Sequence, residues 1–310
     1  MKRGVRMRQR GAVLILMMVA LIMTALTVFA AVINNPNIAM RKRDDTREGL
    51  QTAKAQLLAY AMTFSDNFST APNGPGRLPC PDIDNDGAMN CVGSSATLGR
   101  LPQKEVLLPS GSPYPFSDTN SGIGEQFWYA LPSGYLQDSV LLNSTTATTL
   151  TFDGTADIVA VLMAPGEALT GQTRVSVANQ SNAANYLENG NQTGPAFVSN
   201  NPVSPTLFND LATTITRSEL MSLATVRVVQ EFKRVLEAID YPDSKALFTA
   251  EMSASVTAAA WVVANQWHSS ALENYTETSP NTAKIEFFNC AIDFGITKGV
   301  SGITRSQTTC

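Results

Sequence analysis

The sequence predicts an α+β protein in which a long N-terminal helix is followed by a large head with antiparallel strands. Three observations predict this class. An apolar run leads into an amphipathic helical pattern, two short apolar runs flank a turn signal mid-chain, and the last third carries helical stripes and then a strand pattern. The 310 residues suffice for a substantial core. We expect a basic leader (1–11), a helix (12–64, with 12–33 transmembrane) and a head (65–310).

The first element is an uncharged apolar run behind a basic stub. Residues 12–33 carry no charge, and as a helix rising about 1.5 Å per residue they would cover roughly 33 Å, enough for a bilayer core. A cleavable secretory signal has a shorter apolar region, but "VFA", which ends at Ala30, imitates its cleavage motif. Ordinary export therefore stays an alternative. The basic residues of the stub are Lys2, Arg3, Arg6, Arg8 and Arg10.

Beyond the run, Pro36 stands where it would kink or interrupt a helix. Apolar residues then recur at spacings of three and four, which places them on one helical face. We therefore expect a helix that lies half in lipid and half against the head. The residues of the apolar face are Leu50, Ala53, Leu57, Ala61 and Phe64.

These features together resemble the type IV pilin and pseudopilin superfamily. The match covers about residues 4–64: a basic leader that ends in Gly11, an apolar helix from Ala12, a proline-softened middle and an amphipathic second half. The resemblance implies that a prepilin peptidase cuts after Gly11 and methylates Ala12. It also implies that the helix stays in the bacterial inner membrane with the head in the periplasm, and that subunits then pack helix against helix in a filament.

Leu16 departs from the pattern of major pilins, which carry glutamate as the fifth residue after the cut. The resemblance assigns that glutamate to pairing with the terminal amine of a neighbouring subunit. Because a buried ammonium without a counter-charge is costly, we expect a subunit that needs no preceding neighbour. This resembles the large tip subunit of type II secretion pseudopili and some minor pilins. An ordinary signal anchor is the alternative.

The four cysteines form two pairs that are local in sequence. Cys80 and Cys91 bracket ten residues, and Cys290 and Cys310 bracket nineteen. Four cysteines permit three pairings, of which we expect the local one. In an oxidising compartment, a bridge over such a short loop stabilises the fold by about 3 kcal/mol. Four reduced structural thiols are the alternative, and a zinc site is disfavoured because CxxC spacing is absent and His268 is the only histidine.

The Pro- and Gly-rich segment 72–118 contains the start of a calcium-binding loop. The pattern D-x-D-x-D-G consists of Asp82, Asp84 and Asp86 followed by Gly87. Alternating carboxylates can converge on one hard cation, and glycine permits the sharp turn, so we expect calcium. The twelfth position of a full loop would be glutamate but is Gly93, and the nearest downstream acids are Glu105 and Asp118. A metal-free aspartate-rich turn is the alternative.

The middle of the head predicts short strands and loops. Leu150–Phe152 and Asp157–Met163 flank a "DGT" turn and predict a hairpin, to which residues 172–178 could add a strand. Residues 182–191 predict a short helix, and residues 190–205 a loop.

The last third predicts two helices and a terminal strand or hairpin. Thr216 and Glu219 form a capping box for a helix that runs toward Ile239. A second helix is expected over 244–274, and "KIEFFNCAIDFGITKG" predicts the strand or hairpin that brings Cys290 within reach of Cys310. The apolar stripe of the first helix is Leu220, Leu223, Val226, Val229, Val235 and Leu236.

Charge and motifs exclude several function classes. The chain has 22 basic and 26 acidic residues, so loss of the five basic residues of the leader leaves 17 against 26, a net charge near −9, which disfavours nucleic acid. No GxSxG, phosphate-binding or His-x-Glu motif is present, and we expect no enzyme. The resemblance implies a minor pilin or pseudopilin that primes or caps a type IV pilus or a type II secretion pseudopilus. A membrane-anchored or secreted calcium-binding adhesion module is the alternative, and a periplasmic hydrolase is a more distant one.

Overall fold

The structure is a computed structural model, and the chain divides into two compact units, Met1–Asp45 and Thr46–Cys310. The described residues are 16–27, 36–68, 72–91, 98–104, 121–139, 141–199, 207–238, 260–269, 275–279, 282–288, 290–295 and 305–309.

Residues 16–27 of the first unit form a helix whose large apolar side chains are exposed. They belong to the predicted span 12–33, which extends beyond the described residues at both ends. Within the described part of the chain, none of the helices combines the length and apolarity needed to cross a membrane. The next helix, α2 (Pro36–Asn67), begins at the proline that was expected to interrupt the helix. The first helical position tolerates proline because its N–H would be unpaired there in any case.

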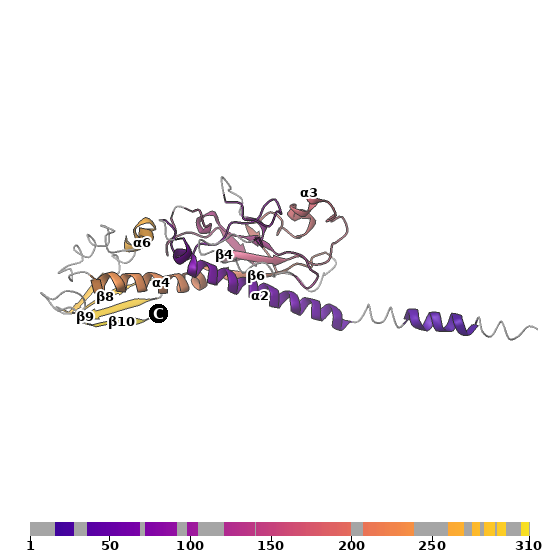
Figure 1. The fold of residues 1–310 in the computed structure, drawn as a ribbon, viewed down its shortest axis with the longest axis horizontal. Coiled ribbons are helices and arrows are strands. Elements are labelled where there is room, and N and C mark those ends of the chain that lie inside the picture. The colour runs from indigo at the N-terminus through magenta and orange to yellow at the C-terminus, as the bar shows by residue number, and fades with distance from the viewer. Residues whose placement is uncertain are drawn as a thin grey trace, which may run out of the picture. The chain divides into compact units, whose positions relative to one another are not determined.

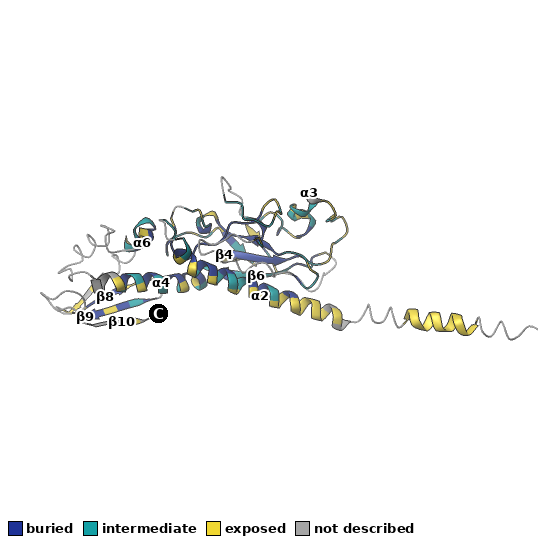
Figure 2. Cartoon of the chain, viewed as in Figure 1, coloured by how far each residue is buried: buried dark blue, intermediate teal, exposed yellow. Residues whose placement is uncertain are grey.

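One face of α2 packs into the core of the second unit. All five residues of the predicted apolar face are buried, and Leu57, Ala53 and Ala61 are completely inaccessible. Tyr60 and Thr46 extend the same face, and the Thr46 hydroxyl accepts a hydrogen bond from the Gly122 N–H at 2.8 Å. Figure 2 shows this contrast between the buried side of α2 and the exposed helix of residues 16–27.

The larger sheet has six strands. They are β1 (Leu98–Arg100), β2 (Trp128–Ala130), β3 (Leu150–Phe152), β4 (Thr155–Ala164), β5 (Ala196–Phe197) and β6 (Leu211–Thr216). Their order is β1-β2-β4-β3-β5, with β6 paired to β4, and every pair is antiparallel except β3 with β5. The predicted hairpin is confirmed: β3 has the expected bounds, and β4 begins two residues earlier than expected, directly after Asp153 and Gly154.

The central strand β4 separates two cores. Val159, Leu162 and Ala164 face the core that contains α2, whereas Ile158, Val161 and Met163 face a second core. The register shifts between Ile158 and Ala160, which interrupts the alternation of the strand. A strand that is buried on both faces has an almost continuous apolar sequence, as "IVAVLMA" does. The second core is completed by Trp128, Ala130, Leu150, Tyr186, Leu187 and Phe197.

Helix α4 (Arg217–Ala238) lies beside α2 on the same side of the sheet (Figure 1). The Thr216 hydroxyl accepts a hydrogen bond from the Glu219 N–H at 3.2 Å, which confirms Thr216 as the cap. Lys54 Nζ lies 2.8 Å from Glu219 Oε2, and Arg227 pairs with Asp66. The pair with the higher residue number on α2 also has the higher number on α4, so the two helices run parallel.

The predicted stripe of α4 is partly wrong. Leu220 and Val229 are buried as expected, but Leu223 is 40% exposed and Val226 is half-buried. The helix packs against α2 and against two sheets, so its buried arc is wide and includes adjacent residues. The side chains of Val235 and Leu236 lie outside the described residues. The other buried residues of the arc are Met221, Ala224, Thr225, Val228 and Phe232.

The C-terminal strands form a second antiparallel sheet, in the order β10-β9-β8-β7. The predicted terminal hairpin is confirmed by β8 and β9, whereas the outer strands β7 and β10 were not predicted. Ile285 and Ile292 are buried. The Phe287 ring packs edge-on against the ring of Phe232 in α4, with 4.9 Å between the ring centroids. The bounds are β7 (Tyr275–Ser279), β8 (Thr282–Glu286), β9 (Ala291–Gly295) and β10 (Arg305–Thr309).

Two expected elements in the middle of the head are wrong, and the loop expected over 190–205 contains the short strand β5. Residues 172–178 form no strand. The Arg174 guanidinium donates to the Asn185 and Gly166 carbonyls at 2.9 and 2.8 Å, which folds the segment back before the short helix α3 (Val177–Gln180). The helix expected over 182–191 is reduced to the 3-10 turn η2 (Ala183–Asn185). A further 3-10 turn, η1, covers Ser133–Tyr135.

The helix expected over 244–274 is interrupted. The described part consists of α6 (Ala260–Ala264) and the helical residues 267–269, with a break between them at Asn265 and Gln266, of which Gln266 has φ +57°. Residues 244–259 and 270–274 lie outside the described residues. Asn265 lies at the break, and its completely buried side chain forms hydrogen bonds with other segments. Its Oδ1 accepts hydrogen bonds from the Leu142 N–H at 2.8 Å and from Arg77 Nη2 at 3.0 Å.

Arg77 is completely buried and joins three segments that are distant in sequence. Its guanidinium donates to the Pro72 carbonyl at 3.0 Å, to the Ser139 hydroxyl at 2.8 Å and to Asn265. Burial lowers the pKa of Arg77 to about 10, and the charge of Asp138 acts in the opposite direction. A buried arginine needs acceptors for its donors, and here Nη1 and Nη2 donate mostly to carbonyls, whereas Nε has no partner among the described residues.

The first testable prediction concerns the contact of α2 with the head. Leu57→Ala in the full chain, solubilised in detergent, should lower the free energy of unfolding by about 2–5 kcal/mol, because a cavity opens at an inaccessible position. Urea unfolding followed by tryptophan fluorescence measures the change. Leu223→Ala is the matched helical control and should change stability much less. Equal losses in the two variants would contradict the packing described.

Candidate functional site

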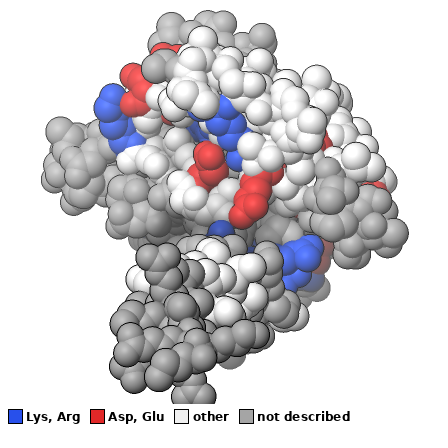
Figure 3. All heavy atoms as spheres, turned by 90° about the vertical axis from the view of Figure 1, so that its right-hand side faces the viewer, with Lys and Arg blue, Asp and Glu red and all other residues white. Residues whose placement is uncertain are grey.

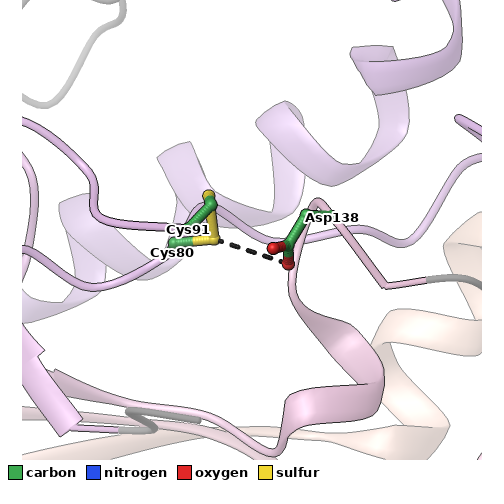
Figure 4. Close-up of side chains that lie close together, drawn as sticks. All are labelled: Cys80, Cys91 and Asp138. Atoms are coloured by element: carbon green, nitrogen blue, oxygen red, sulfur yellow. Dashed lines mark hydrogen bonds between the residues drawn. A yellow bond between two sulfur atoms is a disulfide. The ribbon is translucent and has the colours of Figure 1, made fainter. Parts of the chain in front are cut away.

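A disulfide closes the base of the aspartate-rich loop. Cys80 is bonded to Cys91 with a Cα–Cα distance of 5.3 Å, which is the local pairing expected from the sequence. Cys80 is completely buried, and Asp138 Oδ1 lies 3.9 Å from its sulfur (Figure 4). Although these three side chains are close enough to share a metal, the two sulfurs are bonded to each other and offer no thiolate. The loop that they close is the better candidate for a cation.

The three aspartates of the D-x-D-x-D pattern converge. One carboxylate oxygen from each of Asp82, Asp84 and Asp86 lies within 4.8 Å of the others. Asp82 is buried, whereas Asp84 and Asp86 are exposed. A calcium ion takes six to eight oxygen ligands, so these carboxylates could supply only part of its shell. Gly93, Glu105 and Asp118 lie outside the described residues.

Asp82 organises the loop through backbone hydrogen bonds. Its Oδ1 accepts from the Asn85 N–H at 2.7 Å, and its Oδ2 accepts from the Gly87 N–H at 2.8 Å. Burial raises the pKa of Asp82 and the neighbouring Asp84 acts in the same direction, whereas the two backbone donors oppose them. The loop thus has a defined shape held by Asp82, and a bound cation would add a counter-charge.

Two glycines allow the loop to sit where it does. Gly87 has φ +88°, as the sharp turn of the predicted pattern requires. At Gly99 of β1, an added Cβ would lie 2.5 Å from the Asp82 carbonyl oxygen, so only glycine permits this approach. The neighbouring Arg100 exchanges two backbone hydrogen bonds with Asp82, at 2.6 and 2.9 Å, and these fasten the loop to the larger sheet.

Lys104 is a feature that the sequence analysis missed. Its Nζ lies 3.8 Å from Asp86 Oδ2, so it partly neutralises the cluster and would compete with a cation. Both side chains are largely exposed, and an exposed pair of this kind is weak. Because the amine lies eighteen residues after Asp86, no local spacing signals it.

Arg100 connects the loop to the second core. Its guanidinium stacks on Trp128 and Tyr186, at 4.4 and 4.0 Å from the ring centroids, and it donates to the Gln126 and Gln180 carbonyls at 2.8 and 3.0 Å. Arg174 lies over the same tyrosine ring at 4.5 Å. A cation over an aromatic face is stabilised most when it is desolvated, as Arg100 is. The sequence offers no signal for this stack, because its members come from separate segments.

Charged groups on the face shown in Figure 3 occur as small neighbouring groups of both signs in a mostly neutral surface. Ion pairs of the described residues follow this pattern: Arg174 Nη1 lies 3.5 Å from Glu125 Oε1, and Lys104 lies beside Asp86. A nucleic-acid interface is expected to carry a continuous basic stripe. The described atoms of that face show no such stripe.

The remaining predicted site residues have different outcomes. Gly11, Ala12 and Cys310 lie outside the described residues. Leu16 is helical and 71% exposed, and Pro36 is the first residue of α2. Cys290 is disulfide-bonded, and the pairing of Thr309 with Ala291 in the β9–β10 register favours the predicted bridge to Cys310.

No family model, no curated protein and no solved structure matches the chain.

The second prediction tests the stack. Arg100→Lys retains the charge but loses the planar group and its paired donors, so it should lower the free energy of unfolding by about 2 kcal/mol. Thermal unfolding of the full chain in detergent measures this. Arg234→Lys, at an exposed position on α4 beside Glu231, is the matched control and should change little. A substitution at Arg100 that is as mild as the control would contradict the role of the stack.

Proposed function

We propose that the chain is a minor pilin-like or pseudopilin-like structural subunit that primes or caps a filament from its tip. In this proposal, the N-terminal helix anchors the subunit in the inner membrane and then packs against sister subunits, while the head stays on the periplasmic side. The filament would be a type IV pilus or a type II secretion pseudopilus. The subunit assembles and does not catalyse.

The exposed apolar helix of residues 16–27 is the observation that carries this proposal. Eight of its twelve residues are large apolar side chains that are each at least 52% exposed. A helix that is apolar on all sides is stable only when lipid or protein surrounds it. A filament subunit needs both surroundings in turn, first the membrane and then its neighbours. The eight residues are Leu16, Met17, Met18, Val19, Leu21, Ile22, Met23 and Leu26.

The second support is α2, which has one buried face within the head unit and an exposed face that remains open to neighbours. The exposed residues near the middle of α2 are small or polar, such as Thr52, Ala55 and Ala59. The exposed Leu16 stands where a glutamate would pair with the amine of a preceding subunit. A subunit at the tip has no preceding neighbour, so the leucine agrees with that position. A head of some 240 residues is also accommodated most easily at a tip, where fewer neighbouring subunits surround it.

The third prediction tests maturation, which distinguishes this proposal from plain export. Mass spectrometry of the chain purified from membranes should find a methylated Ala12 as the first residue, because the proposed peptidase cuts on the near side of the apolar run. A control chain with Gly11→Leu should keep its leader. A mature chain that starts at Ala31, or one that keeps Met1, would contradict the proposal.

We further propose that the loop of Asp82, Asp84 and Asp86 binds one calcium ion that stiffens the head. The convergence of three carboxylates on a disulfide-closed turn supports this role, and the positive φ of Gly87 fits it. Magnesium suits the loop less well, because it retains water ligands and demands stricter octahedral geometry.

The fourth prediction separates the metal from the loop's own hydrogen bonds. At calcium concentrations about a hundredfold above Kd, binding should add about 2.7 kcal/mol to stability and raise Tm relative to a chelator. Asp84→Ala should remove this increment but change Tm in chelator little. Asp82→Ala should lower Tm even in chelator, because the Asn85 and Gly87 N–H groups lose their acceptor.

Asp293→Ala, an exposed aspartate on β9, is the control for that experiment and should retain the full calcium response. If the unaltered chain melts at one temperature with calcium and with chelator, the proposed metal role fails while the filament proposal stands.

A further inference from the structure

Two acidic residues, Glu188 and Asp210, lie close together next to Leu187 of the second core. Asp210 precedes β6 and is 1% exposed, and Glu188 lies in the turn after η2. The Glu188 N–H donates to Asp210 Oδ2, and Glu188 Oε2 in turn accepts from the N–H of Asn209, the residue before Asp210, so the two acidic residues lie close together. Because the two residues are twenty-two positions apart, the sequence gives no local sign of the contact.

Three of the four carboxyl oxygens of Glu188 and Asp210 accept a hydrogen bond from an N–H group. Asp210 Oδ2 accepts from the Glu188 N–H at 3.0 Å and from Asn191 Nδ2 at 3.5 Å. Glu188 Oε1 accepts from Gln172 Nε2 at 2.6 Å, and its Oε2 accepts from the Asn209 N–H at 3.2 Å. Asp210 Oδ1 is buried and has no N–H or O–H donor among the described residues. A proton on one carboxyl would let it donate to the other and satisfy this oxygen.

The surrounding charges do not neutralise the pair directly. Arg174 donates to Gln172 Oε1 at 3.0 Å and lies 3.5 Å from Glu125, so the hydrogen bonds of the described residues connect it to Glu188 through the Gln172 amide. From the other side, the backbone carbonyl of Glu167 accepts from Asn209 Nδ2 at 2.7 Å. Glu188 is half-buried and Asp210 is buried, and two adjacent carboxylates without a direct cation do not both ionise without a free-energy cost in such a place.

We propose that Glu188 and Asp210 share one proton and form a pH-responsive latch. The latch fastens residues 186–198, which we call the cover of the second core, to the start of β6. Asn191 extends the latch, because its side chain exchanges hydrogen bonds with the backbone of Val198 at 2.9 and 3.1 Å, next to β5. Tyr186, Leu187 and Phe197 of this cover complete the second core. Loss of the proton would leave two negative charges together and loosen the cover.

Burial, followed by the charge of Glu188, raises the pKa of Asp210 to about 8. In the unfolded chain the aspartate ionises near its ordinary pKa of about 4, so between these values the folded state holds a proton that the unfolded state has lost. This group therefore stabilises the fold most at low pH, and its contribution is lost as pH rises through about 8.

The fifth prediction concerns the full chain in detergent. Between about pH 6 and about pH 9 its Tm should fall by several degrees, and hydrogen-exchange protection at Glu188 and Val198 should fall while that of β4 persists. Asp210→Asn mimics the protonated acid, so it should flatten both profiles and melt above the unaltered chain at high pH. Asp293→Asn, exposed on β9, is the matched control and should follow the unaltered chain.

Glu188→Gln gives a second test, because it removes one charge and offers an N–H to Asp210 Oδ1. It should move the fall in Tm to lower pH. If Asp210→Asn does not fold, the carboxyl ¹³C shift of Asp210 in the unaltered chain decides, and a titration midpoint below about pH 6 would overturn the latch. An Asp210→Asn profile that tracks the unaltered chain would overturn it as well.

Discussion

The burial of one face of α2 is the constraint on which the rest of the head depends. This face must be covered along its length, and the larger sheet and α4 cover it from different sides. The ion pairs of Lys54 with Glu219 and of Asp66 with Arg227 then fix how the two helices lie beside each other. Because α4 continues to the second sheet, where the Phe232 ring contacts Phe287, α4 connects α2 indirectly to that sheet.

The sequence predicted those elements whose signals are local. The periodicity of α2, the turn at Asp153 and Gly154, and the cap at Thr216 all depend on neighbours within a few residues, and each appears in the structure. The errors arose where tertiary contacts override local preference. Residues 172–178 alternate like a strand, but Arg174 folds them back onto distant carbonyls. The helix through Asn265 breaks because that side chain is needed inside the core.

The same distinction applies to the candidate site. Three aspartates at alternating positions are visible in the sequence, and their oxygens do converge. The parts that hold and modulate the loop are Arg100, which fastens it to β1, and Lys104, which approaches Asp86; neither could be inferred from spacing. Chemistry that is built from residues far apart in the chain, such as that of Glu188 and Asp210, becomes visible only in the three-dimensional structure.

Arg77 has a consequence for how the polypeptide matures. One acceptor of its guanidinium, Asn265 Oδ1, belongs to a segment that is made 188 residues later. A nascent chain grows from its N-terminus, so during synthesis this charged group must stay hydrated or find temporary acceptors. Desolvating it earlier would strand unmet donors in an apolar interior. The hydrogen bonding around Arg77 is therefore completed only after the segment that carries Asn265 has been made, and a product that ends before α6 would lack this acceptor.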